Sequence, residues 1–505
     1  MEKVIRRALV SVYHKEGLAE ILKLLHEQGV EFVSTGGTST FIEGLGYPCV
    51  AVEDLTKYPS MLGGRVKTLH PAIQGGILAR RGHETDQKEV IEYGLSLIDL
   101  VIVDLYPFEA TVASGASEED IIEKIDIGGI SLIRGAAKNF EDVVIIPSQA
   151  DYATLLEILR ERGARTTLEE RRHFARRAFA VSSHYDSAIF RYFDAEDHSA
   201  LRLTADEAKP LRYGENPHQK GVFYGDLDRY FEQLHGKELS YNNLQDVEAA
   251  VSLIQDFSEP TFAILKHNNA CGCASRPTLL EAWTDALAGD PVSAFGGVLV
   301  ANRPIDVATA HEIDKLFLEV LIAPDFEAEA LTILEGKKNR ILLRQKEAID
   351  ARWSYRSMLG GVLAQETDRA VETTADMKPV TKVAPTAEEL TDLVFATKLV
   401  KHSKSNAIVL SKGGQLIASG VGQTSRVDAL KQAIEKARHF GFDLKGAVLA
   451  SDAFFPFDDC VTLAAEAGIT AIAQPGGSVR DADSIAAADR LGVAMVMTGG
   501  RHFKH

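Results

Sequence analysis

The sequence predicts a protein of the α/β class with two domains, and three observations carry this prediction. The chain has 505 residues, a length that suggests about two to four domains. Short apolar runs alternate with segments of helical period, which is typical of parallel sheets covered by helices on both faces. A polar stretch at residues 194–208 separates two such regions. We therefore expect one domain at residues 1–195 and another at residues 200–505.

Composition narrows the class of protein. Hydrophobic residues make up 45% of the chain and charged residues 25%, as in ordinary soluble proteins. The formal net charge of -17 argues against a nucleic-acid partner. The four cysteines are too sparse for a disulfide scaffold, so we expect a cytoplasmic protein. No signal peptide is evident, and no stretch approaches the ~20 apolar residues that span a membrane.

The first domain is expected to contain a parallel sheet whose ligands lie beyond the carboxyl ends of the strands. Apolar runs predict strands at residues 8–12, 31–34, 49–52, 97–103 and 143–146. Helical periodicity predicts helices at residues 16–28 and 171–192.

The second domain is expected to consist of two similar α/β halves around a variable middle at residues 327–386. Strands are predicted at residues 294–300, 407–410, 415–418, 447–450, 469–473 and 493–497. Helices are predicted at residues 279–287, 387–401, 427–439 and 485–491.

The stretch from Lys266 to Cys273 is the first candidate for a catalytic site. It follows the apolar run 262–265 and turns abruptly polar. An ammonium held beside an imidazole at the end of a buried strand would favour the neutral imidazole. Such a pair can supply a general base and an electrostatic clamp for acyl transfer. The dipeptide alone also fits a strand end whose two side chains simply reach water.

Several motifs of the first domain fall at predicted strand or helix ends. Residues 35–38 (TGGT) lie between a strand and a helix, where backbone N–H groups can bind phosphate, with Ser11 and Lys15 nearby. The segments GGRVKTLHP, LYPF, IDIGG and AAKN bring two lysines, a tyrosine and an aspartate that can polarise a carbonyl and move protons. Taken singly, each also fits a surface salt bridge or a helix cap.

Taken together, in this order and spacing, these segments resemble the IMP cyclohydrolase domain of the bifunctional AICAR transformylase/IMP cyclohydrolase family, which has a methylglyoxal-synthase-like fold. The resemblance implies catalytic roles for Lys67, Tyr106, Asp126 and Lys138. It implies nucleotide binding by Ser11, Lys15, Ser34, Thr35, Gly36, Gly37, Thr38, Arg65 and Thr68. Asp104 departs from the family, which has Asn before LYPF, so a further carboxylate is expected near Tyr106.

The second domain resembles the transformylase domain of the same family, which has a cytidine-deaminase-like fold without the zinc chemistry. The motif RYGENPHQ at residues 212–219 and the Lys266–His267 pair carry this resemblance. It implies that Lys266 and His267 perform formyl transfer and that Asn406 orients the substrate. AICAR would be bound by Arg212, Tyr213, Gly296, Arg426, Phe454 and Arg501, and the folate by Pro456 and Asp459. Ala270 and Gly500 depart from the family pattern.

The resemblance thus implies a bifunctional enzyme of purine biosynthesis. The formyl group of 10-formyltetrahydrofolate would pass to AICAR, and the product would cyclise to IMP. The family implies a homodimer with transformylase sites across the interface, and it implies no zinc. Whether a structural monovalent cation binds is an open point. Two alternatives remain: a non-catalytic regulatory protein that binds purine nucleotides, and a zinc-dependent nucleoside deaminase. A zinc-dependent deaminase would need an H-x-E motif and a second cysteine pair as zinc ligands. Neither accompanies the C-x-C pair of Cys271 and Cys273.

Overall fold

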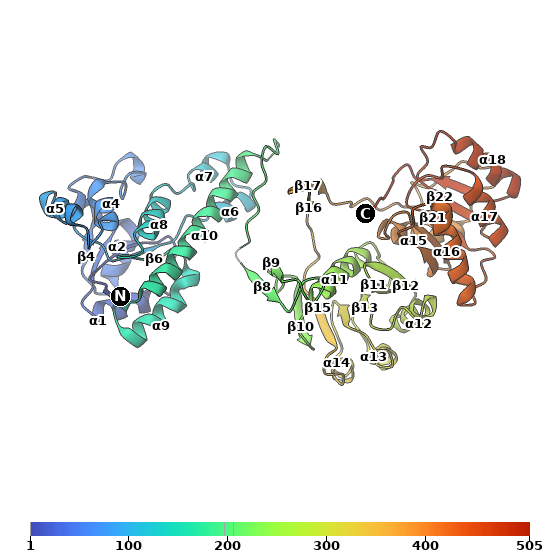
Figure 1. Ribbon diagram of the computed structural model, residues 1–505, viewed down its shortest axis with the longest axis horizontal. Coiled ribbons are helices and arrows are strands. Elements are labelled where there is room, and N and C mark those ends of the chain that lie inside the picture. Colours follow the sequence, from blue (N-terminus) through green and yellow to red (C-terminus); the bar gives the residue numbers. More distant parts are fainter. Residues whose placement is uncertain (1, 196, 206) are drawn as a thin grey trace. The chain divides into compact units, whose positions relative to one another are not determined.

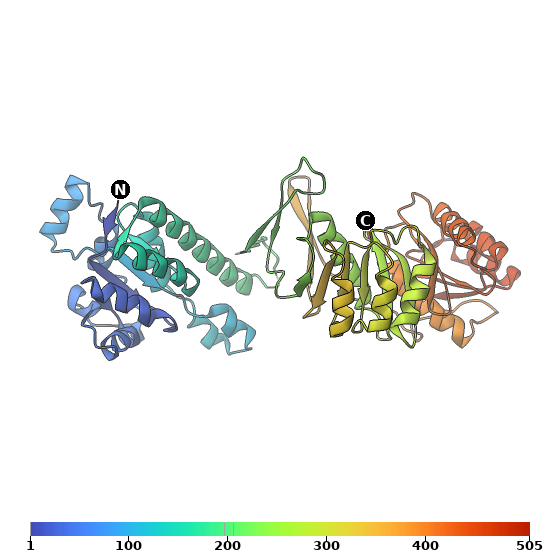
Figure 2. The same ribbon diagram turned by 90° about the horizontal axis from the view of Figure 1, so that it is seen from below.

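The computed structural model describes residues 2–195, 197–205 and 207–505, and the expected linker falls partly outside these ranges. The chain divides into two compact units, Met1–Asp206 and Glu207–His505. Both are built from strands that alternate with helices, as Figures 1 and 2 show. Within the described ranges, no helix has the length and apolar character needed to cross a bilayer.

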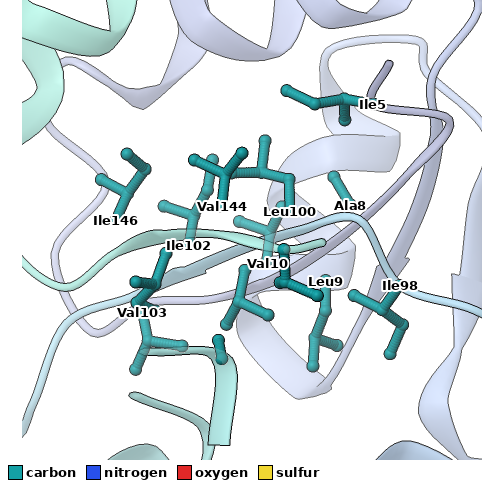
Figure 3. Close-up of a cluster of buried hydrophobic side chains, with 14 of the residues drawn as sticks. Ile5, Ala8, Leu9, Val10, Ile98, Leu100, Ile102, Val103, Val144 and Ile146 are labelled. Atoms are coloured by element: carbon teal, nitrogen blue, oxygen red, sulfur yellow. The ribbon is translucent and has the colours of Figure 1, made fainter. Parts of the chain in front are cut away.

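The first unit is built on a five-stranded parallel sheet of order β4-β3-β2-β5-β6. Its strands are β2 (Arg7–Ser11), β3 (Glu31–Ser34), β4 (Cys49–Ala51), β5 (Leu100–Val103) and β6 (Val144–Ile146), and β1 (Lys3–Val4) pairs separately with β7 (Arg165–Thr166). The side chains of β2, β5 and β6 are fully apolar at their centres and form one buried cluster (Figure 3). Parallel pairing brings Ser11, Ser34 and Val103 to one edge of the sheet.

Ten α-helices of the first unit connect these strands. They are α1 (Leu18–Glu27), α2 (Gly36–Gly44), α3 (Val52–Thr56), α4 (Pro71–Leu78), α5 (Glu84–Glu92), α6 (Phe108–Ala113), α7 (Glu118–Ile122), α8 (Gly128–Lys138), α9 (Tyr152–Arg162) and α10 (Leu168–Phe193), all among the described residues. Two short 3-10 turns add Leu62–Gly64 and Gln149–Asp151. The long helix α10 lies along α8 and covers β6.

The second unit contains a continuous twelve-stranded sheet of order β10-β15-β14-β13-β11-β12-β20-β19-β21-β22-β23-β18. The strands of the first half are β10 (Phe231–His235), β11 (Thr261–Lys266), β12 (Asn269–Ser275), β13 (Val298–Ala301), β14 (Val320–Ala323) and β15 (Ile341–Gln345). Those of the second half are β18 (Lys378–Pro379), β19 (Ile408–Lys412), β20 (Gln415–Gly420), β21 (Val448–Ser451), β22 (Ala471–Gln474) and β23 (Ala494–Met497).

The two halves repeat one topology. In each, an antiparallel hairpin (β11–β12 or β19–β20) is followed by three mutually parallel strands (β13–β15 or β21–β23). The halves join where β12 pairs with β20. This order supports the two similar halves expected from the sequence.

Helices cover both faces of this sheet. One face packs against α11 (Tyr241–Ile254) and α15 (Ala387–Lys401). The other packs against α12 (Leu279–Gly289), α13 (Val307–Ile313), α14 (Ala328–Leu334), α16 (Arg426–His439), α17 (Asp459–Ala467) and α18 (Asp481–Leu491). Two hairpins lie outside the sheet: β8 (Ala208–Leu211) with β9 (Gly221–Tyr224), and β16 (Trp353–Met358) with β17 (Gly361–Glu366).

Candidate active sites

Lys266 ends β11, and His267 and Asn268 form the two-residue turn that leads into β12. Lys266 pairs with Asn269 across the turn. Both turn residues have left-handed backbone, with φ of 50° for His267 and 66° for Asn268. A two-residue hairpin turn of this kind matches the twist of the strands and demands positive φ at both central positions. Asn adopts that conformation readily, but His does so only at a cost that the surrounding contacts must offset.

Three polar contacts hold this turn. The N–H of Asn268 donates to Asp246 Oδ1 at 2.7 Å, from helix α11. The side chain of Asn269 donates through Nδ2 to the carbonyl of His267 at 2.8 Å. The same side chain accepts the N–H of Lys404 at 3.0 Å, which ties the turn to the segment before β19. Burial raises the pKa of Asp246, and the neighbouring His267 and Lys266 partly oppose that rise.

The turn borders a cavity of about 220 Å³ at the joint between the two halves of the sheet. The Lys266 ammonium donates to the carbonyl of Phe295 at 2.7 Å, next to Gly296. The second half contributes Gln432 and Lys436, four residues apart on one face of α16. The lining consists of Lys266, His267, Asn269, Ala270, Cys271, Ser293, Ser419, Val421, Gln432 and Lys436.

The strand β11 is buried, as expected, but the side chains of the pair at its end are not. Lys266 is half-buried and His267 is exposed. The reason is the turn itself, because it carries both residues past the covered end of β11 to the mouth of the cavity. A second cation of this cavity is matched by a carboxylate: the half-buried Lys436 pairs with Asp290 at 2.6 Å, and Asp290 is buried.

Asn406 belongs to a second cluster beside the cavity. Its Nδ2 donates to the carbonyl of Gln423 at 2.9 Å, and its Oδ1 accepts from Arg426 Nη2 at 2.8 Å. The buried guanidinium of Arg426 also pairs with Asp452 and donates to Ser451 Oγ at 2.9 Å. Arg426 is thus bound to protein groups on several sides and orients Asn406.

The remaining expected residues of the second unit lie apart from the lining of the cavity. Arg212 and Tyr213 lie in the loop between β8 and β9, with the guanidinium 5.7 Å from the ring centre. Phe454 is 37% exposed, and Asp459 begins α17 close to Pro456. The Arg501 guanidinium lies 4.4 Å from the ring centre of Phe503 in the C-terminal tail. The structure therefore does not bring these six candidates to the Lys266 cavity within the chain.

In the first unit, the loop that carries Lys67 and Thr68 meets two helix N-termini. A Cβ placed on Gly36, the first residue of α2, would lie 3.6 Å from Lys67 Nζ. One placed on Gly128, the first residue of α8, would lie 3.0 Å from Thr68 Oγ1. Helix N-termini favour anions, and here a lysine ammonium lies beside one of them. This edge of the sheet is therefore suited to a phosphate or carboxylate.

Tyr106 and Asp126 lie together at the same edge. Asp126 Oδ1 accepts the N–H of Gly129 at 2.6 Å. Burial raises the pKa of Asp126, and burial and then Asp126 raise the pKa of Tyr106. Lys124, which the sequence did not single out, places its ammonium 5.5 Å from the ring centre of Tyr13 and 5.8 Å from that of Tyr106. A phenol, a carboxyl and an ammonium are thus gathered at one point.

Most of the hydroxyls expected to bind nucleotide are engaged with the protein. Ser34 is fully buried and donates to the carbonyl of Val10 at 2.6 Å, and Thr38 donates to the carbonyl of Val12 at 3.0 Å. Ser11 Oγ lies 3.5 Å from Thr35 Oγ1. These contacts fix the loop after β3, so its backbone N–H groups and Gly37 are the parts left to face a ligand.

Two cationic candidates of the first unit have protein partners. Lys15 donates to the carbonyls of Val12 and Tyr13 at 2.8 and 2.9 Å. Arg65 forms an ion pair with Glu123. Lys138 is exposed at the C-terminal end of α8, whose eleven residues span about 16 Å from Gly128. The structure thus places Lys138 away from Asp126 within the chain.

Asp104, which departs from the family pattern, holds the loop after β2. Its carboxylate accepts the N–H groups of Tyr13 and of His14, the latter at 2.9 Å, and lies 2.8 Å from His14 Nδ1. The carboxyl group therefore shapes the segment before Lys15. It is 9% exposed, so little of it is open to a ligand.

The sequence also missed residues that line the cavity, namely Ser419, Gln432 and Lys436. The four-residue spacing of Gln432 and Lys436 was the one signal that could have found two of them. The cysteines provide no thiolate, because burial raises the pKa of Cys271 to about 12 and that of Cys273 further still. Among the described residues, no group of three His, Cys, Asp or Glu side chains is placed to hold a metal ion.

Comparisons with known proteins identify the family of this chain. A family model described as "AICARFT/IMPCHase bienzyme" matches residues 136–436, and one described as "MGS-like domain" matches residues 17–131. A "Bifunctional purine biosynthesis protein PurH" from Bacteroides thetaiotaomicron is 68% identical, covering 100% of this chain and 99% of that protein. One of the same name from Chloroflexus aurantiacus is 48% identical, covering 100% and 99%.

Proposed function

Because this chain belongs to the AICARFT/IMPCHase bienzyme family, we propose that its second unit performs formyl transfer at the Lys266–His267 cavity and its first unit performs cyclisation at the Tyr106–Asp126 edge. The chain is a bifunctional enzyme of purine biosynthesis, an AICAR formyltransferase and IMP cyclohydrolase. Its co-substrate is 10-formyltetrahydrofolate, which supplies the one-carbon group. The observation that carries the assignment of sites is the cavity into which the Lys–His turn opens.

In formyl transfer, His267 acts as the general base. The AICAR amine is a poor nucleophile because its lone pair is conjugated with the ring, so it must lose its proton as it attacks. An exposed imidazole at the mouth of the cavity is free to accept that proton. Lys266, held by the carbonyl of Phe295, stabilises the negative charge that develops on the formyl oxygen. The bond from the formyl carbon to the folate nitrogen then breaks, and that nitrogen takes up the proton that His267 had accepted, so tetrahydrofolate leaves. Asn406, oriented by Arg426, fixes the substrate.

In cyclisation, the residues of the first unit act on one molecule and need no co-substrate. The carboxamide nitrogen of formyl-AICAR attacks its own formyl carbon, and water leaves as IMP forms. Closing a ring within one molecule gains from proximity. Lys67 stabilises the oxyanion, while Tyr106 and Asp126 exchange protons. Lys138 would assist Lys67 only from a second copy of the chain, because within one chain it lies away from Asp126. A raised pKa at Asp126 suits this role, because such a carboxyl can hold a proton closer to neutral pH.

The substrate phosphate of each site is assigned to helix N-termini and cations. In the first unit, Gly36 and Lys67 are side by side, and Ser11, Lys15, Ser34–Thr38, Arg65 and Thr68 complete the proposed nucleotide site. In the second unit, Arg212, Tyr213, Gly296, Arg426, Phe454 and Arg501 form the proposed AICAR site, and Pro456 and Asp459 lie toward the folate.

The cavity of one chain is small for the two substrates, which favours a site completed by a second copy of the chain. Its volume of about 220 Å³ is below the roughly 300–1,000 Å³ typical of ligand pockets. It can hold the reacting ends of the two substrates but not both molecules. We propose that the enzyme is a homodimer in which Arg212 and Tyr213 of one copy complete the cavity of the other.

The resemblance leaves a structural monovalent cation as an open point. The described residues gather no group of three or more His, Cys, Asp or Glu side chains, so a cation there would depend on carbonyl and hydroxyl oxygens. No step of the proposed reactions passes through it.

A crosswise pair of variants tests both assignments. His267→Ala should lower formyl transfer by about 100- to 10,000-fold, the usual worth of general base catalysis, and leave cyclisation of supplied formyl-AICAR unchanged. Lys67→Ala should lower cyclisation of supplied formyl-AICAR and leave formyl transfer unchanged. Folate-dependent absorbance follows the first reaction, and IMP formation follows the second. Formyl transfer near the wild-type rate in His267→Ala, or undiminished IMP formation in Lys67→Ala, would reject the corresponding site.

A further inference from the structure

The hydroxyl of Tyr185 reaches from the middle of helix α10 into the loop between α7 and α8. It donates to the carbonyl of Lys124 and accepts the N–H of Asp126 at 2.9 Å. Its ring is buried, with 7% exposed, and contacts Phe108 edge-on at a centroid distance of 6.2 Å. One side chain thus holds the main chain on both sides of Ile125.

We propose that Tyr185 is a positioning residue of the cyclohydrolase site, which fixes Lys124 and Asp126 beside Tyr106 through its single hydroxyl. This inference rests on the proposed function of the first unit. Tyr185 itself touches no substrate in this account, and it acts only through the loop.

The loop has other contacts, but among the described residues none of them engages the Lys124 carbonyl or the Asp126 main-chain N–H. The N–H of Ile125 donates to the carbonyl of Ile122 at 3.0 Å, and the Ile125 side chain packs against the cluster that contains Phe108 and Tyr185. Residues 125–127 belong to no helix or strand. The side chain of Asp126 is held by Gly129 N–H, but its main-chain N–H donates to Tyr185. The loop runs from the end of α7 at Ile122 to the start of α8 at Gly128. The hydroxyl therefore selects one path of the chain between them.

Both ends of the bridged segment carry groups that flank Tyr106. Asp126 is close enough to raise the pKa of Tyr106, and the Lys124 ammonium lies 5.8 Å from the centre of its ring. Burial raises the pKa of Tyr185 to about 12, so the hydroxyl keeps its proton and can donate at neutral pH. Without the hydroxyl, a carbonyl and an N–H lose their partner and the loop must move to find others.

The test uses the full-length protein with Tyr185→Phe, which keeps the ring and removes the hydroxyl. We expect kcat for cyclisation to fall by about 10- to 100-fold, since a displacement of about 1 Å has that effect on a catalytic group. The KM for formyl-AICAR should change by less than about threefold, because the proposed phosphate contacts lie elsewhere. Formyl transfer should stay within about twofold of wild type, because its site lies in the other unit.

Tyr192→Phe is the matched control. Tyr192 lies on the same helix, and its ring also contacts Phe108 edge-on, at 5.8 Å. The substitution likewise removes one hydroxyl from the helix, so a general effect of this change on α10 would appear in both variants. We expect cyclisation by Tyr192→Phe at the wild-type rate.

A double-mutant cycle with Asp126→Asn separates positioning from general stability. If Tyr185 acts through Asp126, adding Tyr185→Phe to Asp126→Asn should lower kcat by less than about threefold. Effects that multiply in the double variant would overturn the proposal, as would a Tyr185→Phe kcat within twofold of wild type. A parallel loss of formyl transfer would show a role in the fold instead.

Amide hydrogen exchange in the wild-type protein keeps the proposal testable even if a variant fails to fold. The Asp126 amide should exchange at least about 100-fold more slowly than a free loop amide. Unprotected exchange would exclude the bridge. An inactive first unit in the wild type would contradict the proposed function, whereas an active wild type with an active Tyr185→Phe would contradict only this inference.

Discussion

At the scale of single residues, His502 shows how charge fixes the C-terminal tail. Its imidazole is 5% exposed, with Nδ1 2.6 Å from Asp368 Oδ2 and Nε2 2.7 Å from Glu372 Oε1. Burial alone would lower the pKa of His502, but the hydrogen bonds to Asp368 and Glu372 outweigh it and raise the pKa to about 9. The protonated form is therefore the one that the folded tail holds.

This pKa predicts that the second unit loses stability at alkaline pH. The pKa of His502 is the ordinary 6.5 in the unfolded chain and about 9 in the folded one. Its contribution to the free energy of unfolding is therefore fully present below about pH 6.5. The contribution, on the order of 3 kcal/mol, is lost as pH rises through 9. Urea unfolding at pH 6.5 and 9.5 measures it, and tryptophan fluorescence reports this unit because Trp283 and Trp353 both lie in it.

His502→Gln should remove most of that pH dependence. His505→Gln, at the exposed end of the same tail, is the matched control and should keep it. Equal pH slopes in wild type and His502→Gln would show that the double ion pair contributes nothing measurable.

At the scale of elements, each half of the large sheet packs a helix onto a glycine of its hairpin. A Cβ on Gly272 of β12 would lie 2.0 Å from the carbonyl oxygen of Ala286 in α12. A Cβ on Gly420 of β20 would lie 1.8 Å from that of Ala429 in α16. Both distances are far inside van der Waals contact, and both neighbours are backbone atoms. The helices therefore lie as close to the sheet as they do only because these positions lack a side chain.

Gly420→Ala should destabilise the second unit by about 1–3 kcal/mol, because the α16 backbone must move. Ser419 and Gln432 line the cavity on either side of this contact, so formyl transfer should fall while cyclisation is unchanged. Urea unfolding and the two assays measure this. In Gly361→Ala, the control, the added Cβ meets its nearest atom at 3.7 Å, an ordinary contact. Equal stability of the two variants would contradict the close packing.

The regular elements could be predicted because their periodicity is local. Glu31–Ser34 and Ala387–Lys401 are found at the predicted residues. The strand predicted at 294–300 instead begins at Val298, since residues 294–297 form the turn that offers Phe295 O to Lys266. The strands β10, β14 and β15 have no counterpart among the predicted elements, although β14 and β15 are apolar runs.

The same reasoning explains which site residues could be found. Lys266 and His267 stood out because polar residues follow an apolar strand. Gln432 and Lys436 did not stand out, because the sequence of α16 indicates only that this face of the helix is polar. The pairing of β12 with β20 determines that this face borders the cavity. The bridge from Tyr185 to Asp126 joins residues 59 apart in sequence, which no local pattern encodes.

At the scale of the whole molecule, the two similar halves build the cavity of the second unit together, and in the proposed homodimer a second copy would complete it. The cavity takes its base and ammonium from the first half and Gln432 and Lys436 from the second, so neither half forms it alone. Within the chain, Arg212 and Tyr213 are outside its lining. A closed two-fold dimer would let each copy lend its β8–β9 loop to the other.

Mixing two inactive variants tests this arrangement. His267→Ala lacks the base and Arg212→Ala lacks the shared loop's guanidinium, so each homodimer is impaired. After unfolding and refolding together in equal amounts, half of the dimers are mixed, and one of their two sites is intact. Formyl transfer should then recover to about one quarter of the wild-type rate, as two-fold symmetry requires. A mixture of His267→Ala with Lys266→Ala should recover nothing, because both changes fall on the same side of every site. No recovery in the first mixture, with dimers present, would place Arg212 in the site of its own chain.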